Sequence, residues 1–296
     1  MSLERKSPPV RWEKVIVNSK SVINYKYFQF IKKSIMQATE LLKNVAPSTT
    51  IIIPAYNEEG RIGRVLEEIA DFVVTNKLNW DVIVSIDGSD NTVEVVKGFS
   101  NDYSFVKYER VMGRSGKGYA IKRVMDKSTG EFTLMTDADS GVSLQEILKG
   151  FSYCGTYDAI LFDRYSANGN TIPLYRRFPS RGFNILVRAM LGLKVMDTQC
   201  GYKLVRTSII KEAFKRIGVT NTFFDVALLY HIQKMGGKIK EIEVKYSHRD
   251  ESKFNIIGEI LGQGVSLFAF RIRHTRFYKY VPKWATELYL KKFRWI

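Results

Sequence analysis

The chain has few cysteines and no long apolar run. Its two cysteines, Cys154 and Cys200, do not have metal-ligand spacing, which argues against a disulfide framework and against a zinc site. No run of 18 or more apolar residues occurs, and the N-terminal segment MSLERKSPPVRWEK lacks the apolar centre of a signal peptide. The three histidines are not clustered, and the chain contains no internal repeat. We therefore expect a protein of a reducing cytosolic compartment that is neither secreted nor membrane-spanning.

Acidic residues are outnumbered by basic ones. The 296 residues include 46 Lys and Arg against 30 Asp and Glu, a formal net charge of +16, and 45% of them are hydrophobic. That apolar fraction is enough for a globular core. The excess of positive charge indicates partners with negative charge, namely nucleic acid, phosphorylated small molecules or an anionic membrane surface. Charge alone does not choose among these three.

Apolar strand-like runs alternate with helix-length segments from residue 49 onward. This alternation predicts an α/β fold with a mostly parallel sheet and helices on both faces. Sheets of this kind bind their ligands at the carboxyl ends of the strands. The predicted strands are 49–56, 80–87, 104–111, 131–139 and 157–163, and the predicted helices are 58–75, 91–99, 116–128 and 143–152.

The regular alternation ends at residue 163. Beyond it we predict a helix at 222–237, a strand at 238–248 and an amphipathic helix at 254–270. In the last of these, Asn255, Glu259 and Gln263 share one helical face, so the helix either packs on the domain or lies in a membrane interface. The predicted organisation is a basic N-terminal arm (1–47) with a helix near 25–45, an α/β domain (48–250) and an amphipathic, basic-aromatic C-terminal segment (251–296).

Two carboxylates, Asp137 and Asp139, follow the predicted strand 131–139 in the stretch TLMTDADSG. One interpretation is a solvated turn, because Asp favours strand ends and caps helices such as the one expected from residue 143. The other is a site for a divalent cation, because Mg²⁺ and Mn²⁺ prefer carboxylate oxygens and accept phosphate oxygens beside them. The stretch alone leaves both interpretations open.

Five motifs, in this order and at these separations, distinguish the chain: IIIPAYNEEGRIGRVLEEI, SIDGSDNT, GKGYA, TDADSG and DTQCGYK. Together they resemble the family 2 glycosyltransferases, which have the GT-A (Rossmann-like) nucleotide-sugar-binding fold. The last motif resembles the branch that charges polyprenyl phosphates, and most closely the dolichyl-phosphate glucosyltransferases. The resemblance runs from about residue 49 to about residue 280. It implies an inverting enzyme that moves glucose from UDP-glucose onto a dolichyl or other polyprenyl phosphate; the alternatives are a mannosyltransferase that uses GDP-mannose and a family 2 transferase with a different acceptor.

The resemblance also implies a nucleotide-sugar site. The pocket for the base and ribose of the donor lies at the first motif, and Asp87 is the one carboxylate left in the second motif to bind the base. Lys117 lies where the start of a helix could approach the phosphate or the base. The family usually has two Asp before Gly-Ser, whereas here Ile86 precedes Asp87. The alternatives are that Asn57 and Glu58 merely begin a helix and that Lys117 is solvated in a surface turn. The donor-binding residues it predicts are Pro54, Ala55, Tyr56, Glu58, Asp87, Lys117 and Asp137.

For the aspartate pair, the resemblance implies a divalent metal, Mg²⁺ or Mn²⁺, bound to the donor diphosphate. Asp139 is the predicted direct ligand, and Asp137 lies nearer the ribose or the metal shell. The chemical reason is leaving-group stabilisation, because a divalent cation neutralises the charge that develops on the departing nucleoside diphosphate.

On the acceptor side, the lipid monophosphate is already largely dianionic, since its second pKa is about 6, and it needs cations rather than a general base. Arg164 and Lys253 share with the two aspartates the predicted catalytic role. Asp197 either positions the acceptor or caps a helix, and Asp225 matches a family Asp near the donor, although Ala227 stands where relatives have Glu. The acceptor-binding residues predicted are Arg164, Arg181, Lys203, Arg249 and Lys253, with His248 beside them.

The C-terminal residues 271–296 interleave eight Lys or Arg with seven Phe, Tyr or Trp against one acid. Such a mixture is typical of peripheral binding to an anionic membrane, here its cytoplasmic face. It could equally bind single-stranded nucleic acid or form an oligomer interface. We favour the membrane because the amphipathic segment 254–270 adjoins it. A basic nucleic-acid-binding protein is the rival class, but such a protein has no reason to place Asp137 and Asp139 at a strand end, so no nucleic acid is expected.

Overall fold

The computed structural model describes residues 46–139, 141–167, 174–218, 221–246, 256–284 and 287. Nearly all of the predicted N-terminal arm, including its helix near 25–45, lies outside these described residues. So do three predicted acceptor-site residues, His248, Arg249 and Lys253.

The described residues form one seven-stranded sheet with the strand order β3-β2-β1-β4-β6-β5-β7. All neighbouring strands are parallel except β6, which runs antiparallel to both β4 and β5. The central strands are continuous apolar runs because both faces of the sheet are covered. The strands are β1 (Thr49–Tyr56), β2 (Trp80–Asp87), β3 (Val106–Val111), β4 (Phe132–Met135), β5 (Ala159–Asp163), β6 (Lys203–Arg206) and β7 (Ile239–Glu243).

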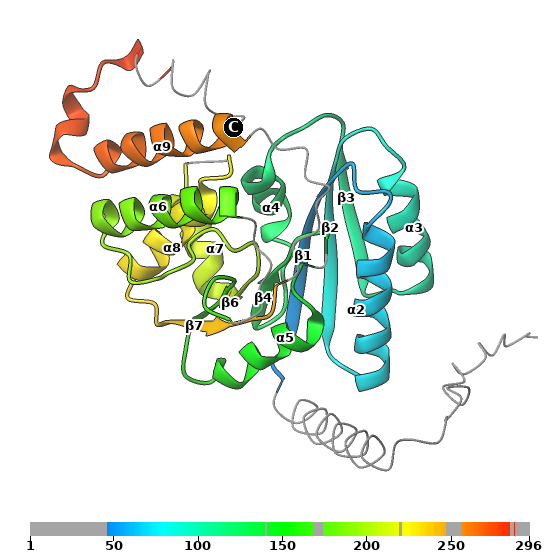
Figure 1. Ribbon diagram of the computed structural model, residues 1–296. Coiled ribbons are helices and arrows are strands. Elements are labelled where there is room, and N and C mark those ends of the chain that lie inside the picture. The colour runs from blue at the N-terminus through cyan, green and yellow to red at the C-terminus, as the bar shows by residue number, and fades with distance from the viewer. Residues whose placement is uncertain are drawn as a thin grey trace, which may run out of the picture. The chain divides into compact units, whose positions relative to one another are not determined.

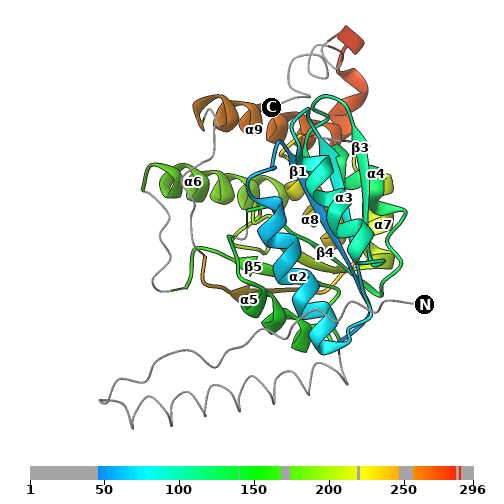
Figure 2. The same ribbon diagram turned by 90° about the vertical axis from the view of Figure 1, so that its right-hand side faces the viewer.

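Helices cover both faces of this sheet, so the predicted α/β class is confirmed. Figures 1 and 2 show α2 and α3 on one face and α4, α7 and α8 on the other, with α6 and α9 stacked outside the second group. The helices are α2 (Ile62–Asn76), α3 (Thr92–Asp102), α4 (Lys117–Met125), α5 (Leu144–Leu148), α6 (Leu174–Leu191), α7 (Thr207–Arg216), α8 (Phe224–Lys234) and α9 (Ile256–Arg273), with 3₁₀ turns η1 (Lys149–Tyr153) and η2 (Arg276–Tyr280).

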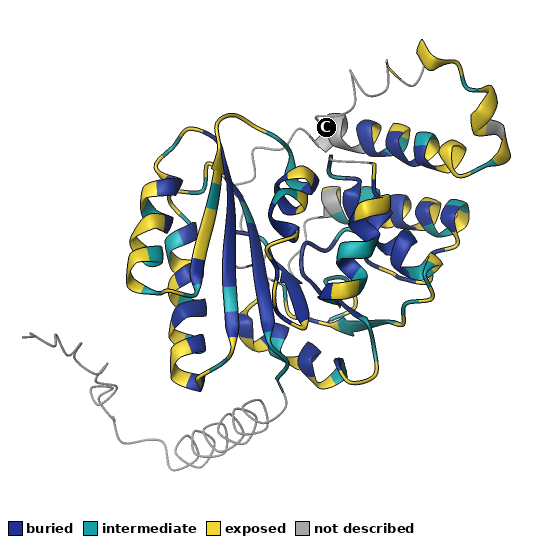
Figure 3. Cartoon of the chain, turned by 180° about the vertical axis from the view of Figure 1, so that it is seen from behind, coloured by how far each residue is buried: buried dark blue, intermediate teal, exposed yellow. Residues whose placement is uncertain are grey.

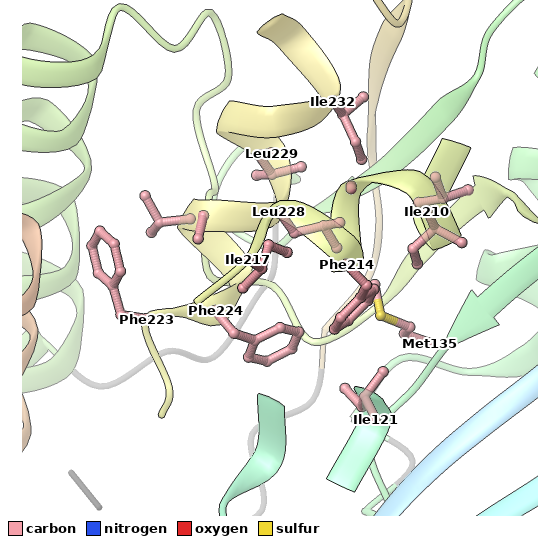
Figure 4. Packing of buried hydrophobic residues seen from close by; sticks show 14 of the residues in the cluster. Ile121, Met135, Ile210, Phe214, Ile217, Phe223, Phe224, Leu228, Leu229 and Ile232 are labelled. Atoms are coloured by element: carbon pink, nitrogen blue, oxygen red, sulfur yellow. The ribbon is translucent and has the colours of Figure 1, made fainter. Parts of the chain in front are cut away.

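A continuous apolar core joins the second face of the sheet to α4, α7 and α8. Phe214 of α7 and Phe224 of α8 stack with ring centroids 6.4 Å apart, and Ile121 and Met135 lie beside them in the same cluster (Figure 4). Nearly every residue of α8 is buried, which is why its segment has no strong amphipathic pattern. This core fixes α4 and α8 under the carboxyl edge of the sheet.

The structure corrects several sequence predictions. Strand β4 ends at Met135, so Asp137 and Asp139 lie in the turn after it and not within a strand that runs to residue 139. Helix α2 begins at Ile62 and not at residue 58, and Asn57 cannot be helical because it has the left-handed conformation with φ of 54°. The segment 58–61 is therefore a turn, and the interpretation that Asn57 and Glu58 begin the helix is wrong.

Helix α9 confirms the amphipathic helix predicted near 254–270. It packs on the domain, because Leu267 and Phe270 are buried in the core cluster. Among the described residues, no helix combines the length and the apolar character that a membrane span requires.

Candidate active site

The carboxyl ends of β1, β2, β4 and β5 meet at one edge of the sheet. Strand β6 runs the other way, so its first residue reaches the same edge, where Lys203 is paired with Met135 of β4. This register brings the DTQCGYK motif, residues 197–203, against the TDADSG motif, residues 136–141. Two motifs that are about sixty residues apart in sequence therefore build one site.

The two aspartates of this site have different partners. Asp137 Oδ1 accepts a hydrogen bond of 2.6 Å from Lys117 Nζ. Asp139 Oδ1 accepts from the Gly141 amide at 3.0 Å and from the Tyr202 hydroxyl at 3.2 Å. Burial alone would raise the pKa of Asp137, but the Lys117 ammonium, with smaller contributions from Arg164 and Lys203, holds it below its usual range. Asp137 is therefore an ionised carboxylate at neutral pH.

Gly201 and Tyr202 fit tightly around this pair. A Cβ atom at position 201 would overlap the carboxylate of Asp137, so only glycine allows the two motifs to approach this closely. The Tyr202 ring is buried, and burial together with the charges of Asp137 and Asp139 raises the pKa of its hydroxyl well above 10. A hydroxyl that stays protonated remains a donor to Asp139. Both residues lie within the DTQCGYK motif, but the sequence alone indicated no role for either of them.

One buried ion pair and one partly buried ion pair lie near the aspartates. Lys203 is fully buried and donates to the Asp225 carboxylate and to the Cys200 carbonyl. Arg164 makes a bidentate pair with Asp197, through Nε at 2.8 Å and Nη2 at 3.0 Å. Bidentate geometry and full hydrogen bonding are what make a buried charge pair tolerable. The helix-cap interpretation of Asp197 is wrong, since the described residues 197–202 form a turn and not a helix; the Asp197 carboxylate accepts from the Gln199 amide at 3.2 Å as well as from Arg164.

Lys203 therefore does not line an open phosphate site, as sequence analysis expected of an acceptor-binding residue. Its side chain has no exposed surface, and its ammonium is fully engaged by protein oxygens. Arg181 lies instead on the exposed surface of α6, with its guanidinium 6.0 Å from the ring centroid of Tyr165. Arg164 contacts the same ring from 5.6 Å. These two arginines therefore share one aromatic platform beside the site.

Lys117 is not the solvated surface lysine of the alternative interpretation. It begins α4 directly after Gly116, whose φ of 88° requires a residue without a side chain. Its ammonium contacts Asp137, and the charges of Asp137 and Asp225 raise its pKa despite an opposing effect of burial. The site therefore has a permanent cation beside its first carboxylate.

On the predicted donor side, Tyr56 ends β1 and remains partly exposed, with Arg114 lying 5.1 Å from its ring centroid. Glu58 pairs with Arg61 at 2.7 Å. Burial, and to a smaller extent the charges of Asp139 and Asp137, raise the pKa of Glu58 against the lowering effect of Arg61. The predicted base and ribose residues therefore border the aspartate pair.

Asp87 has partners that the sequence did not indicate. Its Oδ2 accepts from the Ser115 amide at 2.8 Å and from the Ser115 hydroxyl, and its Oδ1 accepts from Arg123 at 3.1 Å. The side chain is buried. Asp87 therefore ties the loop before α4 to the end of β2. Its contact with the base of the donor stays a prediction.

The aspartate pair fits a divalent metal that is completed by a substrate. Within the described chain, no group of three or more His, Cys, Asp or Glu could hold a metal ion on its own. Asp137 and Asp139 nevertheless offer hard oxygen donors, and a cationic ammonium already lies against Asp137. Mg²⁺ commonly binds through one or two carboxylates with substrate phosphates supplying further ligands. The donor set therefore suits Mg²⁺ or Mn²⁺ together with a diphosphate.

Named proteins of other organisms are similar to this chain over most of its length. The chain is 30% identical over 243 residues to a dolichyl-phosphate beta-glucosyltransferase of Drosophila melanogaster, covering 76% of this chain and 74% of that protein. It is 29% identical over 228 residues to the corresponding enzyme ALG5C of Trichomonas vaginalis, covering 72% of this chain and 67% of that one.

Solved structures show the same fold. Glucosyl-3-phosphoglycerate synthase from Mycobacterium tuberculosis, crystallised with Mn²⁺, UDP and glucosyl-3-phosphoglycerate, matches with a TM-score of 0.58 at 16% identity, over 80% of this chain and 83% of that one. This match confirms the predicted GT-A fold. The model of the family described as glycosyl transferase family 2 matches residues 50–214. The chain is therefore a glycosyltransferase and belongs to glycosyl transferase family 2.

Proposed function

We propose that the protein is an inverting hexosyltransferase that moves glucose from UDP-glucose onto the phosphate of a dolichyl or other polyprenyl phosphate. The names of its relatives support this donor sugar and this acceptor. The observation that carries the proposal is the aspartate pair held by Gly201 and Tyr202 at the carboxyl edge, with Lys117 and Arg164 close by. Carboxylates and cations at one edge suit a substrate pair that is rich in phosphate.

On the donor side, Asp139 and Asp137 would hold a divalent cation on the nucleotide diphosphate. That cation, when bound, supplies neutralisation of the negative charge on the leaving diphosphate. Lys117 adds a second, protein-borne positive charge at the same place. Tyr56 and Glu58 border this point from β1 and the turn after it, where they can line the ribose and base.

On the acceptor side, the reaction needs orientation more than proton transfer. An oxygen of the acceptor phosphate attacks the anomeric carbon and forms the new bond, while the bond from that carbon to the nucleotide diphosphate breaks. The bonding electron pair leaves with the diphosphate, and the configuration inverts in one displacement. Because the lipid phosphate is largely dianionic at neutral pH, no protein base is required. Arg164 and Arg181 are the described cations that we assign to this role, and Arg249 and Lys253 keep their predicted acceptor roles.

The membrane contact predicted for residues 251–296 belongs to the same proposal. A lipid acceptor obliges the enzyme to work at a bilayer, and the cations and aromatic rings after α9 suit its anionic cytoplasmic surface. The division into an arm, a catalytic domain at 48–250 and a C-terminal membrane segment is part of this proposal.

The test is transfer of radiolabelled sugar from UDP-glucose, and separately from GDP-mannose, into an organic-extractable product of dolichyl phosphate. We expect counts from UDP-glucose that are lost with EDTA and restored by Mg²⁺ or Mn²⁺. Counts from GDP-mannose instead would correct the sugar and keep the acceptor. Failure with both donors, in a protein that still binds a nucleotide, would reject the lipid acceptor.

A further inference from the structure

The loop before α4 carries two cations, Arg114 and Lys117, to the carboxyl edge of the sheet. Lys117 donates to Asp137, whereas Arg114 lies over Tyr56, with its guanidinium carbon 5.1 Å from the ring centroid. The Arg114 side chain is exposed, and Tyr56 is 45% exposed at the end of β1. Figure 3 shows the change from the buried central strands to the exposed loops that follow them. Two planar groups therefore lie together at this edge in contact with solvent.

This loop is fixed to the end of β2. The Gly88 amide donates to the Gly113 carbonyl at 2.7 Å, and the Ser115 amide donates to Asp87 Oδ2 at 2.8 Å. Asp87 Oδ1 accepts in turn from Arg123 of α4 at 3.1 Å, and the side chains of Asp87 and Arg123 are 4% and 9% exposed. Hydrogen bonds between charged groups are stronger than neutral ones. The residues on both sides of the exposed arginine are therefore held in place.

Tyr56 is anchored to the same end of β2. The side-chain oxygen Oδ1 of Asn57, which follows it, accepts from the Ser89 amide at 3.1 Å. One residue further, the Glu58 amide donates to the Thr92 hydroxyl at 2.8 Å. The backbone of the tyrosine and the backbone of the arginine loop are therefore fixed relative to one another, and the exposed side chains between them are the parts that can move.

A phenol ring and a guanidinium plane are both groups that stack on a nucleobase, whichever hydrogen-bonding edge the base has. The long stem of Arg114 allows its guanidinium to move from the Tyr56 ring to the outer face of a base that lies on that ring. Asp87 is less suited to meet the base itself, because both of its oxygens already accept hydrogen bonds from the protein and its side chain is buried.

We infer that Arg114 binds the donor by closing on the base of the nucleotide sugar, which lies between the guanidinium and the ring of Tyr56. The inference rests on the proposed function and deepens it, because it names a further donor-binding residue. Asp87 and Arg123 are positioning residues for this contact, since they hold the loop. Stacking adds affinity for any base and leaves the choice of base to groups at its edge.

This contact also links the two ends of the nucleotide. Arg114 and Lys117 belong to one anchored loop, so a single fixed segment presents one cation to the base and another to the diphosphate. A base held at Arg114 therefore sets where the diphosphate lies relative to Lys117 and Asp137. The base thereby helps to orient a leaving group to which it is joined only through the ribose.

The test compares the dissociation constants of uridine, of UDP with Mg²⁺ and of pyrophosphate with Mg²⁺. Arg114→Ala should bind uridine and UDP about tenfold more weakly, because one stacking partner of the base is lost. Pyrophosphate, which has no base, should bind as before. Arg114→Lys keeps the charge but not the plane, so it should bind uridine as weakly as Arg114→Ala does. Arg64→Ala, at an exposed arginine of α2, is the matched control and should bind all three ligands normally.

Three results would overturn the inference. Unchanged binding of all three ligands by Arg114→Ala would show that the residue does not meet the donor. Weaker binding of UDP and pyrophosphate with normal binding of uridine would assign Arg114 to the diphosphate. Full recovery of uridine binding in Arg114→Lys would assign the effect to charge and not to stacking.

Failure of the proposed function is seen separately, because these binding measurements need no acceptor and no sugar. An unaltered protein that binds UDP but transfers no glucose to dolichyl phosphate would reject the proposed reaction and leave the Arg114 comparison intact. If the unaltered protein binds GDP and not UDP, guanosine and GDP replace uridine and UDP with the same expected tenfold loss, roughly, since stacking tolerates either base.

Discussion

Two pairs of opposite charges lie close together at the carboxyl edge of the sheet, and they differ in access to solvent. In the pair of Lys117 and Asp137, the side chains are 27% and 33% exposed. In the pair of Lys203 and Asp225, they are 0% and 7% exposed. An accessible pair can exchange its partners for a substrate or a metal, whereas a sealed pair cannot. The same residue types are therefore open to a substrate at one position and closed within the scaffold at the other.

The comparison teaches how the DTQCGYK motif works. Burial of Lys203 and Asp225 has a desolvation cost that only complete pairing offsets. The pair therefore fixes how β6 and α8 are arranged more than it adds to the net free energy of unfolding. It holds β6 and α8 together, and the residues just before β6, Gly201 and Tyr202, lie against the two aspartates. The DTQCGYK motif therefore positions the two accessible carboxylates, Asp137 and Asp139.

The largest expected effect is the loss of transfer activity on substitution of Asp139, which lies beside the accessible pair. Asp139→Asn should lower transfer by about 10³-fold, because the neutral amide no longer supplies the negative oxygen expected to hold the cation on the diphosphate. The melting temperature should hardly change, since the side chain lies in a turn. Activity and thermal unfolding of this variant are compared with those of Asp126→Asn, an exposed carboxylate at the other end of α4 from Lys117. Full transfer by Asp139→Asn would reject the assignment.

Disruption of the buried pair of Lys203 and Asp225 should lower the free energy of unfolding. Lys203→Met leaves the Asp225 charge buried without its partner, and we expect the free energy of unfolding to fall by about 3–5 kcal/mol. The double variant Lys203→Met with Asp225→Leu should recover much of this loss, because no uncompensated charge remains. Urea unfolding measures both. If Lys203→Met unfolds like the unaltered protein, the pair is not the support that we describe.

The close packing of the DTQCGYK motif against Asp137 can be disturbed at Gly201. Gly201→Ala adds a methyl group where the Asp137 carboxylate lies, so the carboxylate must move. We expect transfer to fall by about 10–100-fold, as for other residues that orient metal ligands, with a weaker affinity for Mn²⁺ and UDP measured by calorimetry. Gly155→Ala is the matched control, since a Cβ there meets nothing within 4 Å.

His231 is a buried ionisable group whose Nε2 has no hydrogen-bond partner among the described residues, in contrast to the two ion pairs. It should therefore make the free energy of unfolding depend on pH. Burial, with His274, Arg216 and Arg273 nearby, lowers the pKa of His231 to about 4. The usual pKa is about 6.5, so between these values the unfolded chain binds a proton that the folded chain does not. Stability should fall by about 2 kcal/mol as the pH drops from 6.5 to 4 and should change little above 6.5 through this residue.

Urea unfolding across this pH range checks the expectation, with His231→Leu as the variant. The leucine protein should lose this part of the pH dependence and keep the remainder. An identical profile in both proteins would show that His231 is already protonated in the fold, against its position among the rings of Tyr230, Phe270 and His274.

The smallest effect is expected at an exposed cation. Arg181→Gln should raise the KM for the lipid acceptor about threefold and leave the KM for the donor unchanged, because a solvated charge contributes up to about 1 kcal/mol. Lys97→Gln on α3 is the control on the opposite face of the sheet. An equal change in both variants would mean that only net charge matters.

The sequence predicted the sheet and the position of the site well, for a physical reason. The strands β1, β2 and β5 are buried on both faces, so each appears as a continuous apolar run. Carboxylates directly after such runs must lie at the carboxyl edge, which is where Asp137 and Asp139 are found. The metal interpretation of that pair draws its support from the other motifs, because the spacing alone also fits a turn.

Other features could not be predicted. Strand β6 has four residues, too few for a pattern, and α6 contains Pro179 and Gly182, which weaken its helical signal. The partners of buried charges are invisible in one sequence, since Lys203 and Asp225 are 22 residues apart and Asp87 and Arg123 are 36 apart. Whether a lysine meets a substrate or a buried carboxylate is decided by packing.

The place of β6 between β4 and β5 sets an order for assembly. Strands β1, β2 and β3 with their helices form from contacts that are local in the chain, as in other βαβ units. Strand β4 is then paired on one side only, and its second neighbour arrives 68 residues after β4 ends. During synthesis the aspartates are present long before Gly201, Tyr202 and Asp225 emerge, while β4 is an unpaired edge that other chains could join. The site is thus complete only after the DTQCGYK motif has been made, and a chain that stops before residue 197 carries Asp137 and Asp139 without the residues that pack against them.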